Sequence, residues 1–359
     1  AANLPANFIF MDFYTNKYRD RIENELRKFL PEHLSEQWVQ EVLGTAKGHH
    51  EINSLDKTVS EPVWNFLKRG GKRWRPVLML LCCETVGGKA EEILQFTVVP
   101  ELIHNGTLIV DDIEDNSDLR RGQPVLHKLF GIDVAVNAGN ALYILPFAAI
   151  RNSSLPAETK AKAYEIITTQ LIKCHLGQAS DIYWHSGKSD KVPSEQEYIQ
   201  MCTNKTGSLA SMAAQLGALL GGGSNEQISA LAKFAETAGV VFQIQDDILN
   251  IALHENIGKE FGDDIKEGKR TLLVIHALNA ASEAEKTRLL EILNMHTKDE
   301  KLLKEAIDII NKHNSIPYTK KTATRLVEET WKETEGAFPE SEAKNQLREL
   351  AQMLIHRSV

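Results

Sequence analysis

Apolar residues recur at helical spacing along almost the whole chain. In residues 16–30, for example, Tyr18, Ile22 and Leu26 form one apolar stripe among charged residues, and Pro31 follows. A stripe of this period predicts an amphipathic helix that ends at the proline. The same spacing predicts further helices at 77–86, 91–115, 134–151, 157–184, 194–220, 225–253, 271–281, 283–294, 298–314, 317–335 and 339–356. No run alternates apolar and polar residues between hairpin turns, so strands are expected to be nearly absent.

Two of the predicted helices are apolar on most faces, around Leu216 and around Val241. Helices of this kind lie in the middle of a large bundle, because no face of them is suited to water. No Pro/Ser-rich linker divides the chain. We therefore predict an all-α fold, in which residues 1–359 form a single large helical bundle around a central cavity. Residues 1–10, which precede Met11, are a candidate expression remnant.

Composition argues against several classes of protein. The 41 Lys+Arg and 49 Asp+Glu residues give a net charge of −8 that is spread along the chain, which argues against a nucleic-acid partner. The hydrophobic share of 42% and the charged share of 25% are typical of soluble globular proteins. We expect no membrane-spanning segment, because no apolar stretch approaches roughly 20 residues, and no secretory signal is visible. The four cysteines follow no pairing or metal-binding pattern, so we expect buried thiols and a cytoplasmic protein.

An acidic cluster ends the helix predicted at 91–115. Asp115 follows Asp111 by four positions and Asp112 by three, so a helix holds the three carboxylates on one face. Like charges at this spacing repel one another, more strongly beside an apolar helix, and a divalent cation removes the repulsion. Mg²⁺ is the expected ion, since it prefers carboxylates together with water and substrate phosphates. Taken alone, the cluster also fits an ordinary acidic helix end.

A second acidic cluster strengthens the prediction of a metal site. Gln243, Asp246, Asp247 and Asn250 lie near the end of the apolar helix predicted at 225–253, with Asp246 and Asn250 four positions apart. Two such helix ends can face each other across a bundle cavity, where carboxylate sites are commonly built. Together they can hold several Mg²⁺ ions around one polyphosphate.

Basic residues alternate with the acidic clusters along the chain. Residues 70–76 place Lys72, Arg73 and Arg75 in a glycine-containing turn before a helix, which suits a phosphate group. The P-loop spacing is missing. The further cations are Arg120, Arg121, Lys205, Lys259 and Lys269. Each cation alone fits a solvated surface charge, but the alternation of acid and base indicates a polyphosphate site.

The ordered set of these motifs resembles the trans-isoprenyl diphosphate synthases, the polyprenyl synthetase family. The resemblance covers about residues 60–280, and the motifs that carry it are 70–76, 111–122, 205–207, 242–250 and 258–270. The segments 111–122, 177–178 and 181–184 are most similar to geranylgeranyl diphosphate synthases.

The resemblance implies an enzyme that condenses isopentenyl diphosphate head-to-tail with allylic diphosphates, through ionisation, condensation and proton elimination. It implies three Mg²⁺ ions on the allylic diphosphate, held by Asp111 and Asp115 on one side and by Asp246 on the other. The released pyrophosphate takes the final proton in this family, so no side-chain base is expected. The resemblance also implies a homodimer.

The other polar residues of the motifs receive roles from the same resemblance. The residues expected to contact the allylic diphosphate are Arg120, Lys205 and Lys259. Those expected to hold isopentenyl diphosphate are Lys72, Arg75, His104 and Arg121, and a buried structural histidine is the alternative for His104. Those expected to support the metal site, mainly by orienting bound water, are Asp112, Asp247, Asn250, Asp264 and Lys269. Thr206, Gln243 and the backbone carbonyl of Lys205 are expected to face the carbocation as weak dipoles.

Two features depart from a simple match to the family. The second motif ends in Asn250 where many members have a third aspartate, but geranylgeranyl-forming members often carry Asn there, so activity is still expected. Pro100 lies inside the helix predicted at 91–115. It should kink this helix or mark a break two to three turns before the acidic cluster.

Product length is expected to depend on the helix before the first acidic cluster. One helical turn rises about 5.4 Å, which is about the length of one isoprene unit. The positions four and five before Asp111 are the small residues Thr107 and Gly106, so the first turn below the acids is expected to be open. The residues expected to close the channel further down are Ile103, Tyr143, Leu142 and Phe147. We predict geranylgeranyl diphosphate, with farnesyl or longer products as alternatives.

Two other functions fit parts of the pattern. A class I terpene cyclase shares an aspartate-rich motif, but it would leave Lys72, Arg75 and Arg121 unexplained, and its second metal motif has wider spacing. A non-catalytic subunit of a prenyl synthase usually loses the first acidic motif, which this chain keeps. Activity of the purified chain alone, with and without EDTA, separates these functions.

Overall fold

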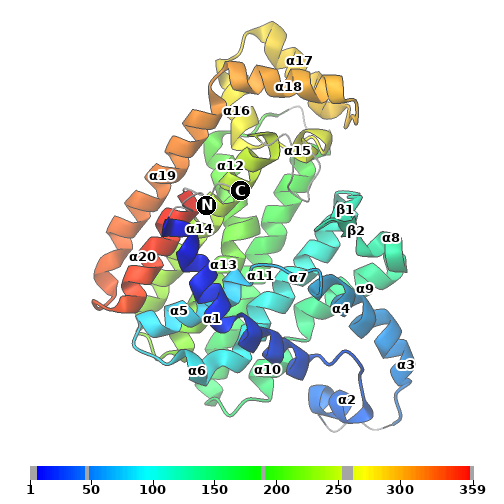
Figure 1. Cartoon of the computed structure of the whole chain (residues 1–359), viewed down its shortest axis with the longest axis vertical. Helices are drawn as coiled ribbons and strands as arrows, with labels where there is room; N and C mark the ends of the chain where they lie inside the picture. The colour runs from blue at the N-terminus through cyan, green and yellow to red at the C-terminus, as the bar shows by residue number, and fades with distance from the viewer. Residues whose placement is uncertain (1–5, 45–47, 187–190, 253–261, 356–359) are drawn as a thin grey trace. The chain divides into compact units, whose positions relative to one another are not determined.

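Helices form almost all of the structure, a computed structural model that describes residues 6–44, 48–186, 191–252 and 262–355 (Figure 1). Strands in this part of the chain are limited to β1 (Leu119–Arg120) and β2 (Gln123–Pro124), which pair antiparallel. The all-α fold predicted from the apolar spacing is therefore confirmed. The chain divides into two compact units. The single domain around a central cavity stays a prediction.

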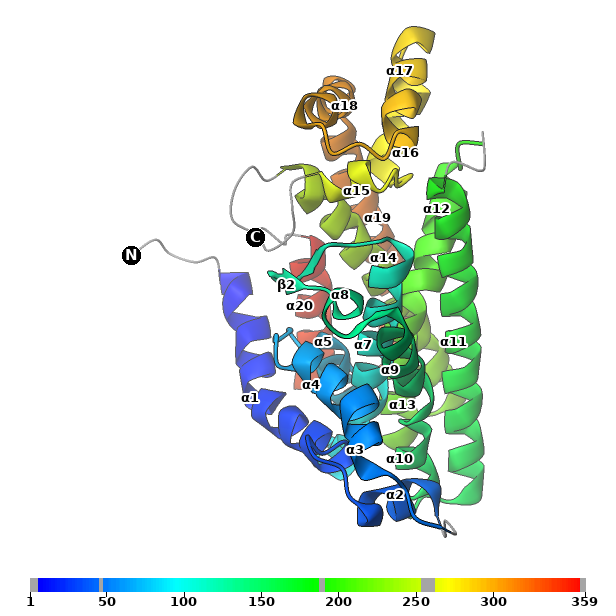
Figure 2. The same cartoon turned by 90° about the vertical axis from the view of Figure 1, so that its right-hand side faces the viewer.

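Unit 1 comprises residues 1–167, 212–228 and 339–346. Its helices are α1 (Ala6–Phe29), α2 (Glu36–Leu43), α3 (Ile52–Leu55), α4 (Glu61–Leu67), α5 (Trp74–Thr85), α6 (Ala90–Ile93), α7 (Val98–Glu114), α8 (Leu126–Phe130), α9 (Ile132–Ile144) and α10 (Phe147–Arg151). Within this unit α7 lies beside α9 and also packs against α1 and α5 (Figure 2). The central part of α5 is completely buried, so α5 and α7 form the apolar core.

Unit 2 comprises residues 168–211, 229–338 and 347–359. Its helices are α12 (Glu195–Cys202), α15 (Asp263–Lys266), α16 (Leu272–Ala280), α17 (Glu283–Asn294), α18 (Glu300–Lys312) and α19 (Ser315–Thr334). The unit boundaries fall inside α11 (Ala157–His185), α13 (Ser208–Leu220), α14 (Asn225–Ala252) and α20 (Glu342–Ile355). The apolar helix α16 packs against α12, α17, α18 and α19 within unit 2.

The helix predicted at 91–115 is interrupted. A 3₁₀ turn at Leu94–Thr97 separates α6 from α7. Pro100 is the third residue of α7 and lies in its first turn, where the missing N–H costs no helical hydrogen bond. Of the two expected effects of Pro100, the structure therefore has the break, and α7 continues from there to the first acidic cluster.

Other predicted helices also contain interruptions. A π-helical turn at Thr203–Gly207 connects α12 to α13 in the segment predicted as one helix. The segment predicted at 134–151 is divided between α9 and α10 near Pro146. Single π-helical turns inside helices occur frequently at functional sites. The short helices α2, α3 and α4 were not predicted, because segments of this length carry little periodic pattern.

Two described segments, 90–114 and 132–151, are by length and composition long and apolar enough to cross a membrane. The expectation that no apolar stretch approaches this length was therefore wrong. In the first segment 72% of the apolar window is buried, which is typical of a core helix. In the second segment 33% is buried, and Ile132, Val136 and Ile144 are exposed.

A buried ion-pair network fixes the 70–76 turn to α7. Arg73 has a left-handed backbone conformation, and its Nη1 donates to Glu101 of α7 at 2.7 Å. Its Nε donates to Glu23 at 2.8 Å, and Asn105 donates to the same Glu101 carboxylate at 2.7 Å. Arg73 was predicted, with its cationic neighbours, to suit a phosphate group, but in the structure it pairs with two carboxylates of the protein.

We expect Glu101→Ala to lower the free energy of unfolding by about 3 kcal/mol, because it removes one carboxylate from a buried guanidinium. The Arg73 side chain is 1% exposed and that of Glu101 4%, so water cannot replace the lost partner. Denaturant unfolding followed by circular dichroism measures the change.

Glu92→Ala is the matched control, because Glu92 pairs with Lys89 on the surface of the same unit. This control should change the free energy of unfolding by less than about 1 kcal/mol. Equal effects of the two substitutions would show that the Arg73 network does not stabilise the fold.

Candidate active site

The first aspartate cluster lies at the end of α7, where the β1–β2 hairpin brings Arg120 back to it. The Nε atom of Arg120 donates to Oδ1 of Asp112 at 2.8 Å, and its Nη2 bonds the same oxygen. Nη2 also lies 3.7 Å from Oδ2 of Asp111. The Asp112 side chain is 1% exposed, whereas that of Asp111 is 19% exposed. Asp112 is therefore held inside the protein, and Asp111 reaches the surface.

The charges of this cluster perturb one another. Burial raises the pKa of Asp112 to about 6, the Arg120 guanidinium opposes this rise, and Asp111 and Asp115 add to it. Burial alone would lower the pKa of Arg120, but Asp112 and Asp111 raise it above its ordinary value. Three carboxylates around one guanidinium leave an excess of negative charge, which a cation would neutralise.

A group of cations lies beside this cluster in the same unit. Arg121 donates through Nη1 to the carbonyl of Gly70, and a Cβ on Gly71 would lie 3.1 Å from its Nη2. The glycines thus let the turn approach the guanidinium closely. Burial, together with the positive charge of Arg73, lowers the pKa of Arg121 to about 10. Glu101 partly opposes this lowering, and the guanidinium of Arg121 lies 5.3 Å from the centroid of the Phe66 ring.

His104 of α7 belongs to the same positively charged region. Burial lowers the pKa of His104 well below its ordinary value, and Arg75 and Arg121 lower it further, so the imidazole is neutral. Its Nδ1 is buried and has no hydrogen-bond partner among the described residues. Lys72 lies exposed in the neighbouring turn. Three of the four residues predicted to hold isopentenyl diphosphate, Arg75, His104 and Arg121, therefore lie close together in unit 1 beside Arg120, and Lys72 lies in the turn before Arg75.

The second aspartate cluster lies on α14 in unit 2. Tyr198 of α12 donates to Oδ2 of Asp247 at 2.6 Å, and Gln243 donates to Oδ1 of the same carboxylate at 2.9 Å. Thr206 donates its hydroxyl to Oε1 of Gln243 at 3.0 Å. Burial raises the pKa of Asp247 to about 6, against the effect of its two hydrogen bonds. Asp247 is buried and Asp246 is half-buried, which repeats the arrangement of Asp112 and Asp111.

Lys205 lies in the π-helical turn that joins α12 to α13. Its Nζ donates to Asp181 of α11 at 2.7 Å. Burial would raise the pKa of Asp181, but the Lys205 charge holds it well below its ordinary value. A Cβ on Gly177 would lie 2.3 Å from the Lys205 backbone nitrogen, so only glycine allows α11 to approach the turn. The Lys205 carbonyl, expected to face a carbocation, accepts a hydrogen bond from the Cys174 thiol at 3.4 Å.

Asn250 anchors the segment that follows α14. Its side-chain oxygen accepts from the backbone nitrogen of Asp264 at 3.1 Å, and its carbonyl accepts from Gly262 at 3.2 Å. The asparagine in place of a third aspartate thus fixes the start of α15. Lys269 pairs with Glu267 and lies 4.0 Å from Asp264. The predicted site residue Lys259 lies outside the described residues.

The chain-length residues on α7 face different surroundings. A Cβ on Gly106 would lie 2.9 Å from the Gly139 carbonyl and 2.9 Å from Leu142 Cβ, so Gly106 faces α9 and no open channel. Thr107 is half-buried like Asp111, on the same stripe of α7. Ile103 is completely buried. The expectation of open space one turn below the acids therefore stays a prediction for Thr107. For Gly106 it was wrong, because the close contact with α9 leaves no space there.

Tyr143 of α9 and Phe147 of α10 are half-buried in unit 1. Phe147 stacks on Tyr164 with ring centroids 5.7 Å apart. Their expected role in closing a channel stays a prediction.

The residues that hold the motif side chains were not among the predicted site residues. Tyr198 and Asp181 were given no role, although each contacts a motif residue directly. Tyr198 lies 49 positions from Asp247, so no local sequence pattern could have found this contact. For Asp181 the available indication was its place in the 181–184 segment, which carried part of the family resemblance.

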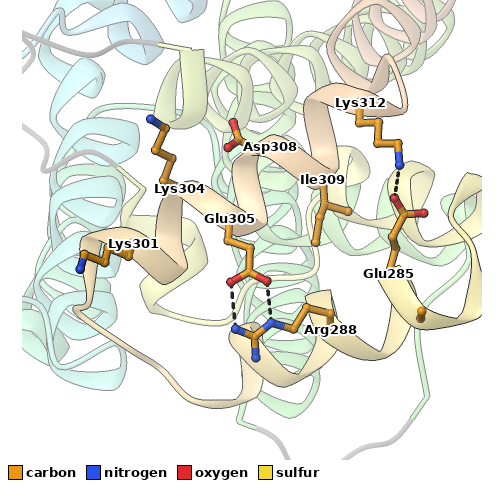
Figure 3. Close-up of a pocket in the computed structure, with 9 residues that line it drawn as sticks. Glu285, Arg288, Lys301, Lys304, Glu305, Asp308, Ile309 and Lys312 are labelled. Atoms are coloured by element: carbon orange, nitrogen blue, oxygen red, sulfur yellow. Dashed lines mark hydrogen bonds and ion pairs between the residues drawn. The ribbon is translucent and has the colours of Figure 1, made fainter.

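A separate cleft of about 580 Å³ lies between α17 and α18 in unit 2 (Figure 3). Ion pairs between Arg288 and Glu305 and between Lys312 and Glu285 cross it. No motif residue lines this cleft. Its balanced charges fit a surface groove between two helices.

The polyprenyl synthetase family model matches residues 56–310. The chain therefore belongs to the polyprenyl synthetase family, which confirms the resemblance found in its motifs. Membership of this family defines the chain as a prenyltransferase.

Similar proteins match nearly the full length. A short chain isoprenyl diphosphate synthase from Methanothermobacter thermautotrophicus is 37% identical over 296 residues, which are 82% of this chain and 88% of that protein. The crystal structure of a geranylgeranyl pyrophosphate synthetase from Pyrococcus horikoshii Ot3 has a TM-score of 0.81 at 30% identity, covering 97% of this chain and 98% of that one. That of a geranylgeranyl pyrophosphate synthase from Corynebacterium glutamicum, complexed with isoprenyl diphosphate and magnesium, has a TM-score of 0.80 at 26% identity, covering 97% and 99%.

Proposed function

We propose that this chain makes geranylgeranyl diphosphate by condensing isopentenyl diphosphate head-to-tail with allylic diphosphates. The observation that carries the proposal is the arrangement common to both aspartate clusters. In each, a first aspartate that reaches the surface precedes a second that is buried and held by protein donors. The names of the similar proteins from P. horikoshii and C. glutamicum support geranylgeranyl diphosphate as the product.

The donor set of the aspartate clusters fits Mg²⁺, and we propose three ions held by Asp111, Asp115 and Asp246. Oδ2 of buried Asp112 accepts no hydrogen bond from the described residues, which leaves it for water on an ion. Mg²⁺ prefers to complete its ligands with water and substrate phosphate. When bound, the ions neutralise charge on the diphosphate leaving group.

Arg120 and Lys205 bind the allylic diphosphate in this proposal, together with Lys259. Arg120 pairs with Asp112 and Lys205 with Asp181, so both cations are ionised and oriented before substrate arrives. When the allylic C–O bond breaks, its electron pair leaves with the diphosphate. Fixed positive charges stabilise this developing charge without reorganisation.

Isopentenyl diphosphate binds at the cations of unit 1. Arg75, Arg121 and Lys72 supply the positive charge, and a bound diphosphate would offset the burial and the repulsion from Arg73 that lower the pKa of Arg121. The unpartnered Nδ1 of His104 offers one further hydrogen bond. Placing this site beside the first aspartate cluster brings the second substrate to the reacting end of the first.

The carbon–carbon bond forms when the isopentenyl double bond attacks the allylic cation, and the released pyrophosphate then takes a proton from the product. The Thr206 hydroxyl donates a hydrogen bond to Gln243, so the lone pairs of the Thr206 oxygen are left to face the carbocation. These weak dipoles stabilise positive charge without acting as nucleophiles. No side-chain base is needed for this sequence.

The length of the product depends on Thr107 in this proposal. Thr107 shares the half-buried stripe of α7 with Asp111 and lies one turn before it, where a small side chain leaves room for the growing chain. Tyr143 and Phe147 are proposed to close the channel further down.

We also propose that the chain is a homodimer. On α9, Ile132 is 61% and Ile144 67% exposed, and on α11, Ile172 is 62% and Leu176 60% exposed. Ile172 and Leu176 lie one turn apart on the same face of α11, and exposed apolar side chains gathered in this way mark interaction surfaces.

A reducing compartment, the cytoplasm, is proposed from the cysteines. All four are buried free thiols, and burial raises the pKa of Cys83 to about 12, which keeps it unreactive.

We expect the purified chain, supplied with Mg²⁺, isopentenyl diphosphate and farnesyl diphosphate, to form geranylgeranyl diphosphate, which mass spectrometry detects. EDTA should abolish the product. Asp111→Ala should lower turnover by at least about 100-fold, because it removes a metal-facing carboxylate, and should leave the helical circular-dichroism signal intact.

Asp118→Ala is the matched control, since Asp118, which lies between α7 and β1, pairs with Lys128 of α8 on the surface of unit 1. It should keep near-wild-type turnover. Near-normal turnover of Asp111→Ala would contradict the metal assignment, and no product from any allylic diphosphate would contradict the proposed function.

We expect Thr107→Phe to shift the main product from geranylgeranyl to farnesyl diphosphate, because the ring fills the first turn below Asp111. Chromatography of the products formed from geranyl diphosphate measures the shift. Gly106→Phe should instead lower the melting temperature, because its side chain collides with α9. If Thr107→Phe folds and its main product is unchanged, Thr107 does not lie in the channel that limits product length.

We expect sedimentation equilibrium to give twice the mass of one chain. Ile144→Glu should move the equilibrium toward the monomer, because it places a charge on an exposed apolar face of α9. A wild-type chain that sediments as a monomer at micromolar concentration would rule out the dimer.

A further inference from the structure

Tyr198 holds a carboxylate of the second aspartate cluster from outside the recognised motifs. Its side chain is 1% exposed, and its hydroxyl donates to Oδ2 of Asp247 at 2.6 Å. The other oxygen of Asp247 accepts from Gln243 at 2.9 Å. Donors from two different helices thus occupy both oxygens, so the carboxylate can neither rotate nor turn toward solvent.

This hydrogen bond joins the two predicted substrate-binding segments of unit 2. Tyr198 belongs to α12, which continues directly into the π-helical turn that carries Lys205. Asp247 follows Asp246 on α14. A second connection runs between the same segments, from Thr206 through Gln243 to Asp247. The two connections fix the π-helical turn and the acidic end of α14 against each other.

We propose that Tyr198 is a positioning residue of the active site, which holds Asp247 so that Asp246 presents its carboxylate to Mg²⁺ and diphosphate. The inference rests on the proposed function and adds to it a residue that acts through another. Groups that hold a metal-supporting carboxylate typically change metal affinity about 10–100-fold when they are removed.

A purely structural role predicts a different result. The buried tyrosine ring fills space between α12 and α14, and Tyr198→Phe keeps the ring and removes only the hydroxyl. If packing were its whole contribution, this substitution would leave ligand binding unchanged. If the hydroxyl positions Asp247, the loss falls on metal–diphosphate binding.

The test uses the full chain and inorganic pyrophosphate with Mg²⁺, measured by isothermal titration calorimetry without turnover. We expect Tyr198→Phe to weaken this binding about tenfold and to raise the Mg²⁺ concentration needed for half-maximal activity by a similar factor. Tyr18→Phe is the matched control, because Tyr18 is equally buried and donates to Glu84 in unit 1. It should leave pyrophosphate binding unchanged.

A second variant tests whether the effect passes through Asp247. The double variant Tyr198→Phe/Asp247→Asn should bind Mg²⁺–pyrophosphate less than about twofold more weakly than Asp247→Asn alone. The reason is that Asp247→Asn has already altered the hydrogen bond between the two side chains. The double variant also avoids an unpaired buried charge, so it keeps the test open if Tyr198→Phe alone folds poorly.

The outcomes separate this inference from the proposed function. Unchanged pyrophosphate binding in Tyr198→Phe, or an equal loss in Tyr18→Phe, would overturn the positioning role while wild-type activity stands. A wild-type chain that forms no prenyl product and binds no Mg²⁺–pyrophosphate would overturn the proposed function itself.

Discussion

A buried carboxylate must be paired, and this requirement organises both aspartate clusters. Asp112 is paired by Arg120, and Asp247 by Tyr198 together with Gln243. An unpaired ionised carboxylate at either position would cost several kcal/mol. Because consecutive helical residues point about 100° apart, pairing the second aspartate of each cluster inward leaves the first directed elsewhere. The hydrogen bonds that pair the buried aspartates thus also orient the neighbouring aspartates that are proposed to bind metal.

The fold was largely predictable from the sequence, because long amphipathic helices carry their period in the order of residues. The helices around 157–184 and 283–294 are found almost where the period predicted them. Interruptions were less predictable. Pro100 predicted a break in its helix. The π-helical turn at Thr203–Gly207 contains no proline, and α11 packs closely against it at Gly177.

The acids and cations of the candidate site could be selected from their spacing in the sequence, and their roles toward metal and substrate stay predictions. The partners of these side chains could not be predicted in this way. Arg73 reads like its cationic neighbours, and only the fold brings it to Glu101. From the sequence, the small residue Gly106 predicts open space beside α7. In the structure α9 packs into that space. Tyr198 lies 49 positions from Asp247, so no local sequence pattern predicts their hydrogen bond.

The proposed function requires both aspartate clusters to bind one magnesium diphosphate. A crystal structure of the chain with Mg²⁺ and an unreactive allylic diphosphate analogue tests this most directly. We predict carboxylate oxygens of Asp111, Asp115 and Asp246 at about 2.0–2.1 Å from ions that share the same diphosphate. A diphosphate bound by one cluster alone, with Asp246 on a separate surface, would contradict the claim.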